Sequence, residues 1–316
     1  MLVGGFNINN NEEMSVESFF GASQDVYASE NNLYLAQTVY DDNWTGNTTI
    51  YKFNLINSQI VLQAKGEIEG YLNNQFSMDE YEGNLRLATT YTINEGKEEV
   101  VGDADGVPVT NVSETKYSNR LYVLDKDLKE IGRIDNLAEN EQIYSVRFIG
   151  KMGYIVTFKQ IDPLFVIDLS NPKKPQVKGE LKIPGYSSYL HPYDENHIIG
   201  IGYNTKSNGY GGITNDNMKM SMFDVSDVQN PKEMFSIDIG SQYVHSEILY
   251  NHKSLFYKKS ENLIGFPVSY DGKSRIEIFK IDLESGFEKY AEILNDKGYY
   301  GIERAIYIGD TLYTLH

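Results

Sequence analysis

The sequence contains no cysteine, which excludes disulfides, thiolate nucleophiles and cysteine-based zinc sites. Proline is also scarce, with 8 residues in 316, and this composition favours strands. No run approaches the ~20 apolar residues of a membrane-spanning helix, so we expect a soluble protein without membrane insertion. The first ten residues lack the basic and apolar segments of a signal peptide. The chain is therefore expected to be cytosolic, or a mature or partial segment.

Basic residues are few: the sequence has 28 Lys and Arg against 45 Asp and Glu, and the net charge is −17. An acidic surface repels a phosphate backbone, so nucleic acid is excluded as a partner. The abundant residues are those of strands and turns, with 25 Tyr, 14 Phe and 27 Gly. The length exceeds the roughly 250–300 residues at which one core usually splits, and a repeat architecture avoids that limit.

One pattern recurs six times along the chain. An apolar or special residue is followed seven positions later by a residue that opens a second strand, with a polar turn between them. Such spacing is typical of tight β-hairpins. The six pairs are Val26 and Leu33, Met78 and Leu85, Arg147 and Tyr154, His191 and Ile198, Ile248 and Leu255, and Ala305 and Leu312.

A third strand follows in five units and ends in a polar residue, and a more polar fourth strand comes after it. The ends of the third strands are Asn54, Asp125, Asp168, Asp224 and Asp282. Four strands in hairpin succession indicate a propeller blade, because a β-sandwich does not repeat one four-strand register. We therefore predict a single all-β domain over 1–316, a β-propeller with units starting near 26, 78, 147, 191, 248 and 305.

The two ends of the chain complement each other. The last unit stops after its second strand, and the chain begins with what we interpret as third and fourth strands. We predict six four-stranded blades, with residues 1–21 completing the last one and covering open sheet edges. The alternative is part of a larger ring of seven or eight blades.

Several segments carry a resemblance to a known family. They include SVRFIG at 145–150, VTFKQIDPLFVIDLSNP at 156–172 and MFDVSDVQNPKE at 222–233. The chain resembles the bacterial secreted C-terminal β-propeller domain family, which is distantly related to tryptophan–aspartate repeat propellers. The resemblance implies an extracellular or cell-envelope protein without an assigned activity and supplies no catalytic residues. Family domains extend further upstream than this chain, and the tryptophan–aspartate dipeptide is absent here.

Two insertions, at 92–118 and 203–219, fall between second and third strands. We predict that the face carrying these insertions and the fourth-to-first connections binds ligand, because binding residues favour variable loops on a rigid scaffold. Surface decoration is the alternative. Polar and aromatic residues are expected to converge there at the mouth of the central channel. The candidate ligand-binding residues are Asn73, Gln75, Arg147, Tyr189, His191, Tyr299, Glu303 and Arg304.

Arg147 and His191 occupy a repeat position that is otherwise apolar, so they are expected to serve either a polar network between blades or a ligand. Asp103 and Asp105 begin a sequence with weak similarity to a calcium loop, and no other cofactor is indicated. No catalytic motif is present. We predict a non-catalytic binding scaffold for protein, peptide or carbohydrate. The alternatives are a propeller hydrolase, either a metal-dependent lactonase or a glycan-cleaving enzyme, and a structural module of a longer surface protein.

Overall fold

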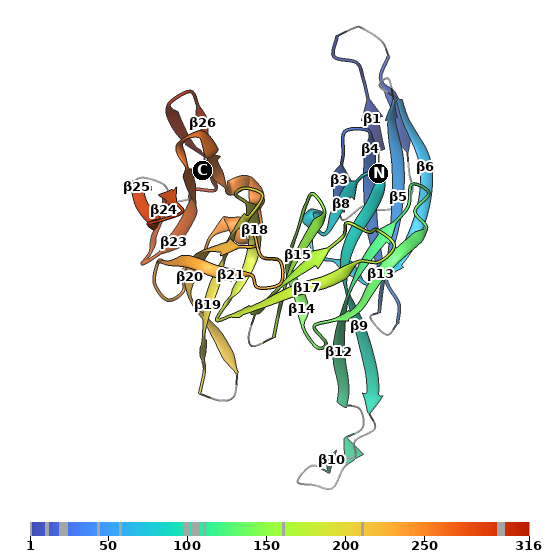
Figure 1. Cartoon of the computed structure of the whole chain (residues 1–316), viewed down its shortest axis with the longest axis horizontal. Coiled ribbons are helices and arrows are strands. Elements are labelled where there is room, and N and C mark those ends of the chain that lie inside the picture. Colours follow the sequence, from blue (N-terminus) through green and yellow to red (C-terminus); the bar gives the residue numbers. More distant parts are fainter. Residues whose placement is uncertain are drawn as a thin grey trace. The chain divides into compact units, whose positions relative to one another are not determined.

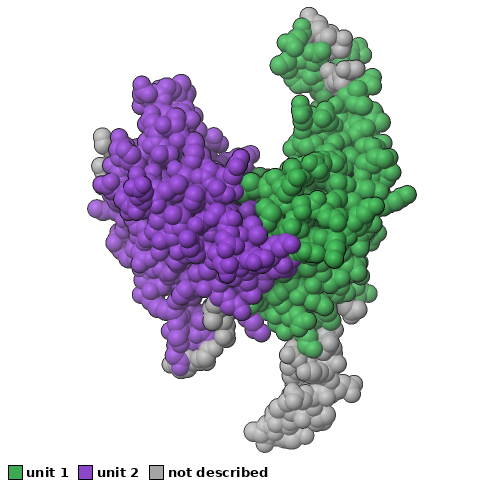
Figure 2. Space-filling model, viewed as in Figure 1, with its two compact units in different colours: residues 1–153, 167–176 green, residues 154–166, 177–316 purple. Residues whose placement is uncertain are grey.

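The structure is a computed structural model that describes residues 2–9, 13–18, 25–42, 45–56, 59–97, 101–102, 108–109, 112–159, 162–209, 212–295 and 301–315. The chain forms two compact units (Figure 2). Unit 1 consists of residues 1–153 and 167–176, and unit 2 of residues 154–166 and 177–316. The described residues form antiparallel sheets with a few short 3-10 helices, which confirms the all-β prediction. None of these helices is long and apolar enough to cross a membrane.

Unit 1 contains two complete sheets (Figure 1). The first follows the chain in hairpin succession through β3 (Asp25–Ala28), β4 (Asn32–Tyr40), β5 (Gly46–Ile56) and β6 (Gln59–Glu69). The second has the same order, but its inner strand is split into two pieces that both pair with β9. Its strands are β7 (Tyr71–Leu72), β8 (Met78–Tyr81), β9 (Asn84–Lys97), β12 (Val112–Leu124) and β13 (Glu130–Leu137).

The third sheet comprises β14 (Gln142–Ile149), β15 (Met152–Phe158), β16 (Asp162–Asp168) and β17 (Gln176–Ile183), and the division between the units runs through it. Unit 2 contains two further four-stranded sheets. The fourth sheet is made of β18 (Tyr186–Pro192), β19 (His197–Ser207), β20 (Ile213–Asp224) and β21 (Lys232–Ile239). The fifth is made of β22 (Phe256–Lys258), β23 (Leu263–Tyr270), β24 (Lys273–Asp282) and β25 (Gly286–Leu294).

Both ends of the chain form two-stranded sheets. β1 (Leu2–Gly5) pairs with β2 (Ser15–Ser18), and β26 (Arg304–Ile308) pairs with β27 (Thr311–Leu315). Each end of the chain therefore has the two strands that the sequence analysis predicts as half of a blade. Completion of one blade from these two halves stays a prediction.

The inner strand of the fifth sheet begins later than the sequence predicts. Ile248 lies in the 3-10 helix η2 (Glu247–Leu249), and β22 starts at Phe256. The Ser246 side chain caps η2 by accepting a hydrogen bond from the Ile248 N–H, so the backbone leaves the strand conformation there. Ile248 is still buried, which explains why its apolar character fits the repeat. The seven-residue spacing recurs at Phe256 and Leu263, eight residues downstream.

A repeated turn ends the third strand of each sheet from the second to the fifth. Each terminal aspartate accepts a hydrogen bond from the backbone N–H two residues later, at 2.9 Å. This is the Asx turn, in which a side chain replaces a backbone acceptor. Hydrogen bonds that the Ser226 hydroxyl and N–H donate to its carboxylate lower the pKa of Asp224 to about 2. The residues that share the turn are Asp125, Asp168, Asp224 and Asp282.

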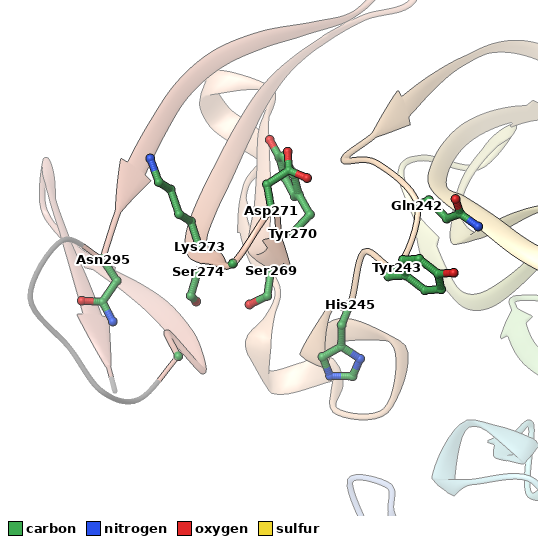
Figure 3. A pocket seen from close by; sticks show the side chains of 11 residues that line it. Gln242, Tyr243, His245, Ser269, Tyr270, Asp271, Lys273, Ser274 and Asn295 are labelled. Atoms are coloured by element: carbon green, nitrogen blue, oxygen red, sulfur yellow. The ribbon is translucent and has the colours of Figure 1, made fainter.

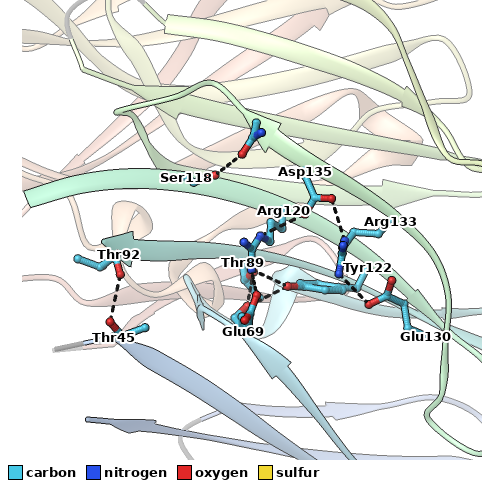
Figure 4. Close-up of polar contacts among 11 residues, drawn as sticks. Thr45, Glu69, Thr89, Thr92, Ser118, Arg120, Tyr122, Glu130, Arg133 and Asp135 are labelled. Atoms are coloured by element: carbon cyan, nitrogen blue, oxygen red, sulfur yellow. Dashed lines mark hydrogen bonds and ion pairs between the residues drawn. The ribbon is translucent and has the colours of Figure 1, made fainter. Parts of the chain in front are cut away.

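Polar side chains join the first and second sheets of unit 1 (Figure 4). Arg120 on β12 forms ion pairs with Glu69 at the end of β6 and with Asp135 on β13. The Thr89 hydroxyl donates to the Glu69 carbonyl oxygen at 2.9 Å. An apolar core that includes Tyr34, Ile50, Met78, Leu87 and Tyr122 also connects the two sheets. Adjacent sheets thus share both a core and a polar seam, as neighbouring repeats in a repeat protein do.

The two insertions are extensions of strands over much of their length. β9 and β12 pair continuously from Leu85 with Leu124 to Lys97 with Val112, and they form a two-stranded arm (Figure 1). At the end of the arm, β10 (Val101–Gly102) pairs with β11 (Pro108–Val109). β19 and β20 likewise pair as far as Ser207 with Ile213. The ligand-binding role of these insertions stays a prediction.

Candidate functional site

A polar cleft of about 650 Å³ opens in unit 2 at one end of the fifth sheet (Figure 3). At this end β23 turns into β24, and the chain arrives from β21. These are a second-to-third and a fourth-to-first connection, the kinds that the sequence assigns to the binding face. The volume falls within the ~300–1,000 Å³ typical of ligand sites. The described lining residues are Gln242, Tyr243, His245, Ser269, Tyr270, Asp271, Gly272, Lys273, Ser274, Asn295 and Gly301. We refer to this as the Tyr243 cleft.

Tyr243 has an unusual backbone conformation for a bulky side chain. Its φ is +68°, in the left-handed region, and its side chain is 87% exposed. The turn is held from both sides, because the Ser241 hydroxyl donates to Asp271 Oδ1 at 2.9 Å and the Val244 N–H donates to the Ser241 carbonyl at 3.2 Å. A left-handed conformation costs about 1–2 kcal/mol for such a residue, and an exposed ring regains little of this by burial. Conformational strain of this kind concentrates at functional sites.

His245 fixes the same loop to β23. Its N–H donates to the Ser269 carbonyl at 2.9 Å, and the Ser269 N–H donates to the His245 carbonyl at 2.8 Å. The imidazole stacks on Tyr250, with ring centroids 5.8 Å apart. In addition, the Tyr203 hydroxyl donates to the Val244 carbonyl at 3.1 Å. This wall of the cleft is therefore anchored to two sheets of unit 2.

A charged network supports the opposite wall. The Tyr270 hydroxyl donates to Glu277 at 2.7 Å, and the Arg275 guanidinium packs over the Tyr270 ring at 3.9 Å. Lys289 donates to the same Glu277 at 2.9 Å. Burial, followed by the nearby Glu277 carboxylate, raises the pKa of Tyr270, so its hydroxyl stays protonated at neutral pH. The Tyr270 ring is thus held in place as part of this wall.

The β23–β24 turn presents polar groups to the cleft. Asp271 and Gly272 both have positive φ, +52° and +70°, and the flanking Tyr270 and Lys273 pair directly. This is a two-residue hairpin turn of the Asp-Gly type, which matches the twist of the strands. Asp271 in the turn supplies a carboxylate, and the flanking Lys273 supplies an ammonium group. Asp271 is the acidic residue among the described lining residues. The groups present suit recognition.

A second, smaller pocket of about 290 Å³ lies in unit 1, between the inner strands of the first three sheets. We call it the Arg147 pocket. The Arg147 guanidinium stacks on the Phe76 ring at 3.8 Å. The structure thus brings together two of the predicted residues, Gln75 and Arg147. The described lining residues are Val26, Tyr27, Ala28, Gln75, Phe76, Met78, Asp79, Arg147 and Phe148.

The other described residues of the predicted set belong to both units, and each is described by its own contacts. Asn73 lies outside the described lining of the Arg147 pocket, and its side chain donates to the Tyr144 carbonyl at 2.7 Å. Tyr189 and His191 contact each other in unit 2, where the hydroxyl and Nδ1 are 3.2 Å apart, and His191 packs edge-on against Tyr257. The Glu303 N–H donates to the Leu315 carbonyl, and Arg304 begins β26.

Three predicted residues, Tyr299, Asp103 and Asp105, lie outside the described residues. Within the described ranges, no group of three or more His, Asp or Glu side chains is placed to hold a metal ion. The convergence of the predicted residues on one channel mouth stays a prediction. Tyr243 was not predicted as a site residue, although its position in a fourth-to-first connection of the predicted binding face was an available signal.

Comparison with known proteins gives relatives of unknown activity. An uncharacterized protein of Archaeoglobus fulgidus is 37% identical over 268 residues, which cover 85% of this chain and 35% of that protein. An uncharacterized protein of Methanocaldococcus jannaschii is 35% identical over 267 residues, which cover 84% of this chain and 37% of that protein. The chain thus spans about a third of the length of the curated relatives it matches.

Among solved structures, two variants of the Synechocystis apocarotenoid oxygenase are similar at 7% sequence identity, with TM-scores of 0.46 and 0.47. They cover 84% and 86% of this chain and 58% and 59% of their own. The profile of a family described as the β-propeller domain matches residues 1–316. That match and the repeated antiparallel sheets agree, and the chain belongs to the β-propeller domain family.

Proposed function

We propose that this domain is a non-catalytic recognition scaffold that binds a protein segment, a peptide or a glycan through the Tyr243 cleft. The observation that supports this most directly is Tyr243 itself, an exposed aromatic ring on a strained backbone at the edge of a polar cleft. Tyrosine supplies rigid, amphipathic contact area at low entropic cost. The adjacent amide, hydroxyl, ammonium and carboxylate groups offer the hydrogen bonds that peptides and sugars require.

The surrounding architecture supports recognition by this end of the sheet. The wall behind Tyr243 is fixed by backbone pairing with β23, and the opposite wall by the Tyr270–Arg275–Glu277 network. A pre-organised surface of this kind loses less entropy when a ligand binds. We also propose six blades closed by residues 1–21, and an extracellular or cell-envelope location as the family resemblance implies.

Binding arrays of glycans and of short peptides test the proposal, with the wild-type domain and a Tyr243→Ala variant. Binding of at least one class is expected, with affinity reduced about 30-fold in the variant, the effect of losing a tyrosine hot spot. Tyr290→Ala is the matched control, because Tyr290 is also well exposed but lies on β25 outside the described cleft lining. Equal binding by wild type and Tyr243→Ala, or no binder on either array, would contradict the proposal.

A further inference from the structure

The Tyr243 cleft combines aromatic rings with polar groups. Its described lining contains two tyrosines and one histidine, and every other side chain there, apart from two glycines, carries a hydroxyl, amide, carboxylate or ammonium group. None of these described lining residues is aliphatic. A peptide usually anchors an apolar side chain in a pocket that removes it from water, and this lining offers no such pocket. The lining favours a ligand that has a flat, weakly apolar face and many hydroxyl groups.

The rings near the cleft are open to contact by a ligand. Tyr243 is 87% exposed and Tyr250 is 76% exposed. The imidazole of His245, which lines the cleft, stacks on Tyr250 with ring centroids 5.8 Å apart and planes 26° apart. The face of an aromatic ring is electron-rich, so it attracts the C–H groups on one side of a sugar ring. Tyr243 supplies one such surface, and the pair of His245 and Tyr250 supplies another.

The β23–β24 turn supplies hydrogen-bonding groups that match sugar hydroxyls (Figure 3). The exposed Asp271 accepts a hydrogen bond from the Ser241 hydroxyl through Oδ1, which uses one of about four acceptor positions of an ionised carboxylate. The exposed Lys273 is a donor only. Each hydroxyl of a sugar both donates and accepts, so neighbouring hydroxyls can use the acceptor and the donor of this turn. Gln242, from the connection after β21, adds an amide with both functions.

The charges at the cleft compensate each other. Asp271 and Lys273 bring opposite formal charges to the described lining. Behind the Tyr270 wall, ion pairs of 2.5–3.5 Å join two cations and two carboxylates, namely Arg275, Lys289, Glu277 and Glu292. The whole chain carries a net charge of −17, which repels anions at long range. These charges favour an uncharged ligand.

We propose that the Tyr243 cleft binds a neutral oligosaccharide, with one sugar ring on the face of Tyr243 and sugar hydroxyls on Asp271 and Lys273. This inference rests on the proposed function and narrows it to one class of ligand. The volume of about 650 Å³ suits a drug-sized ligand, which is larger than a single sugar ring, so more than one unit of the oligosaccharide fits. A proline-rich peptide is the main competitor, because such peptides dock on aromatic-lined grooves. It has few groups that would use the donors and acceptors of the turn.

Calorimetric titration of the full chain separates these ligand classes. The neutral probes are cellotetraose, maltotetraose, mannotetraose and chitotetraose, the acidic probe is tetragalacturonate, and the peptide probe is tetraproline. At least one neutral tetrasaccharide is expected to bind at least tenfold more tightly than tetragalacturonate and tetraproline. Its affinity is expected to change less than about twofold between low and high salt, because screening does not act on an uncharged ligand.

Four variants test the contacts. Tyr243→Ala is expected to weaken binding of the tetrasaccharide at least tenfold, whereas Tyr243→Phe keeps the ring and is expected to bind within about threefold of wild type. Asp271→Asn is expected to give a partial loss, because asparagine tolerates the left-handed turn but offers fewer acceptor positions. Tyr290→Ala, on β25 outside the described lining, is the control and is expected to bind like wild type. Thermal unfolding shows that each variant is folded.

The outcomes distinguish this inference from the proposed function. The inference is overturned if no neutral tetrasaccharide binds, if binding is lost at high salt, or if folded Tyr243→Ala binds like wild type. Binding of tetraproline through Tyr243 without any neutral tetrasaccharide would refute the sugar class and leave recognition by the cleft standing. Failure of every probe, together with no binder on the arrays, would refute both.

Discussion

Tyr243 allows stability and ligand binding to be changed in opposite directions. Replacement by glycine removes the left-handed strain, which is about 1–2 kcal/mol for a residue with a Cβ. Glycine also gains freedom in the unfolded chain, which offsets about 0.5–1 kcal/mol. Because the side chain is 87% exposed, little buried area is lost. The Tyr243→Gly variant is therefore expected to be more stable than wild type by about 0.5–1 kcal/mol.

The measurement is the thermal midpoint, together with urea unfolding at pH 7. A gain of this size raises the midpoint by about 1–3 °C in a domain of this length. Tyr243→Ala is the matched control, because it removes the ring but keeps the Cβ, so no stabilisation is expected. Both variants are expected to lose the ligand affinity of the cleft. A Tyr243→Gly variant that is less stable than Tyr243→Ala would refute the strain argument, and retained affinity in either variant would refute the role of the ring.

Further predictions concern the turns, the buried ion pair, a close backbone approach and the chain ends. The pKa of Asp224 is lowered to about 2, so its stabilising contribution is present above pH ~4 and is lost as the pH falls towards 2. Between pH 7 and pH 2.5 the urea midpoint of Asp224→Asn should therefore fall less than that of the wild type. Arg86→Met leaves the partly buried Asp79 without its cation. It is expected to cost about 2–3 kcal/mol in urea unfolding, less than the ~3–5 kcal/mol of a fully buried pair, and a cost below 1 kcal/mol would contradict this account of the pair. At Gly202 a Cβ would lie 1.7 Å from a backbone oxygen, so Gly202→Ala should lower the thermal midpoint strongly, whereas a wild-type midpoint would exclude the described β18–β19 approach. Deletion of residues 1–21 is expected to promote aggregation in light scattering if they complete the last blade, and unchanged solubility and midpoint would argue against that closure.

Much of the fold could be predicted because each strand is encoded locally. The aspartate at the end of a third strand is visible in the sequence as a polar residue after an alternating run, and the structure shows it closing a turn. The start of the first strand of the fifth sheet was predicted too early, because the apolar Ile248 is buried but belongs to a 3-10 helix. Burial gives the same apolar signal in a helical turn as in a strand, so spacing alone could not distinguish them.

The candidate sites show a similar limit. Arg147 was identifiable because a charge interrupts an apolar repeat position, and its neighbour Gln75 lines the same pocket. Tyr243 was not identified, since a single tyrosine in a polar loop is unremarkable in a chain with 25 of them. Its distinction is a backbone angle of +68°, which depends on hydrogen bonds to residues distant in sequence, such as Asp271.

The aspartate turns also bear on how this architecture tolerates change. In each of four sheets the connection between third and fourth strands is fastened by its own carboxylate, at the end opposite the second-to-third hairpin. Strand register is therefore set locally at one end, and residues added at the other end lengthen a hairpin without displacing its neighbours. The arm of β9 and β12 illustrates this freedom, since the same sheet holds both the longest described strand and an intact Asp125 turn. Such a scaffold can acquire new binding segments blade by blade while its core stays the same.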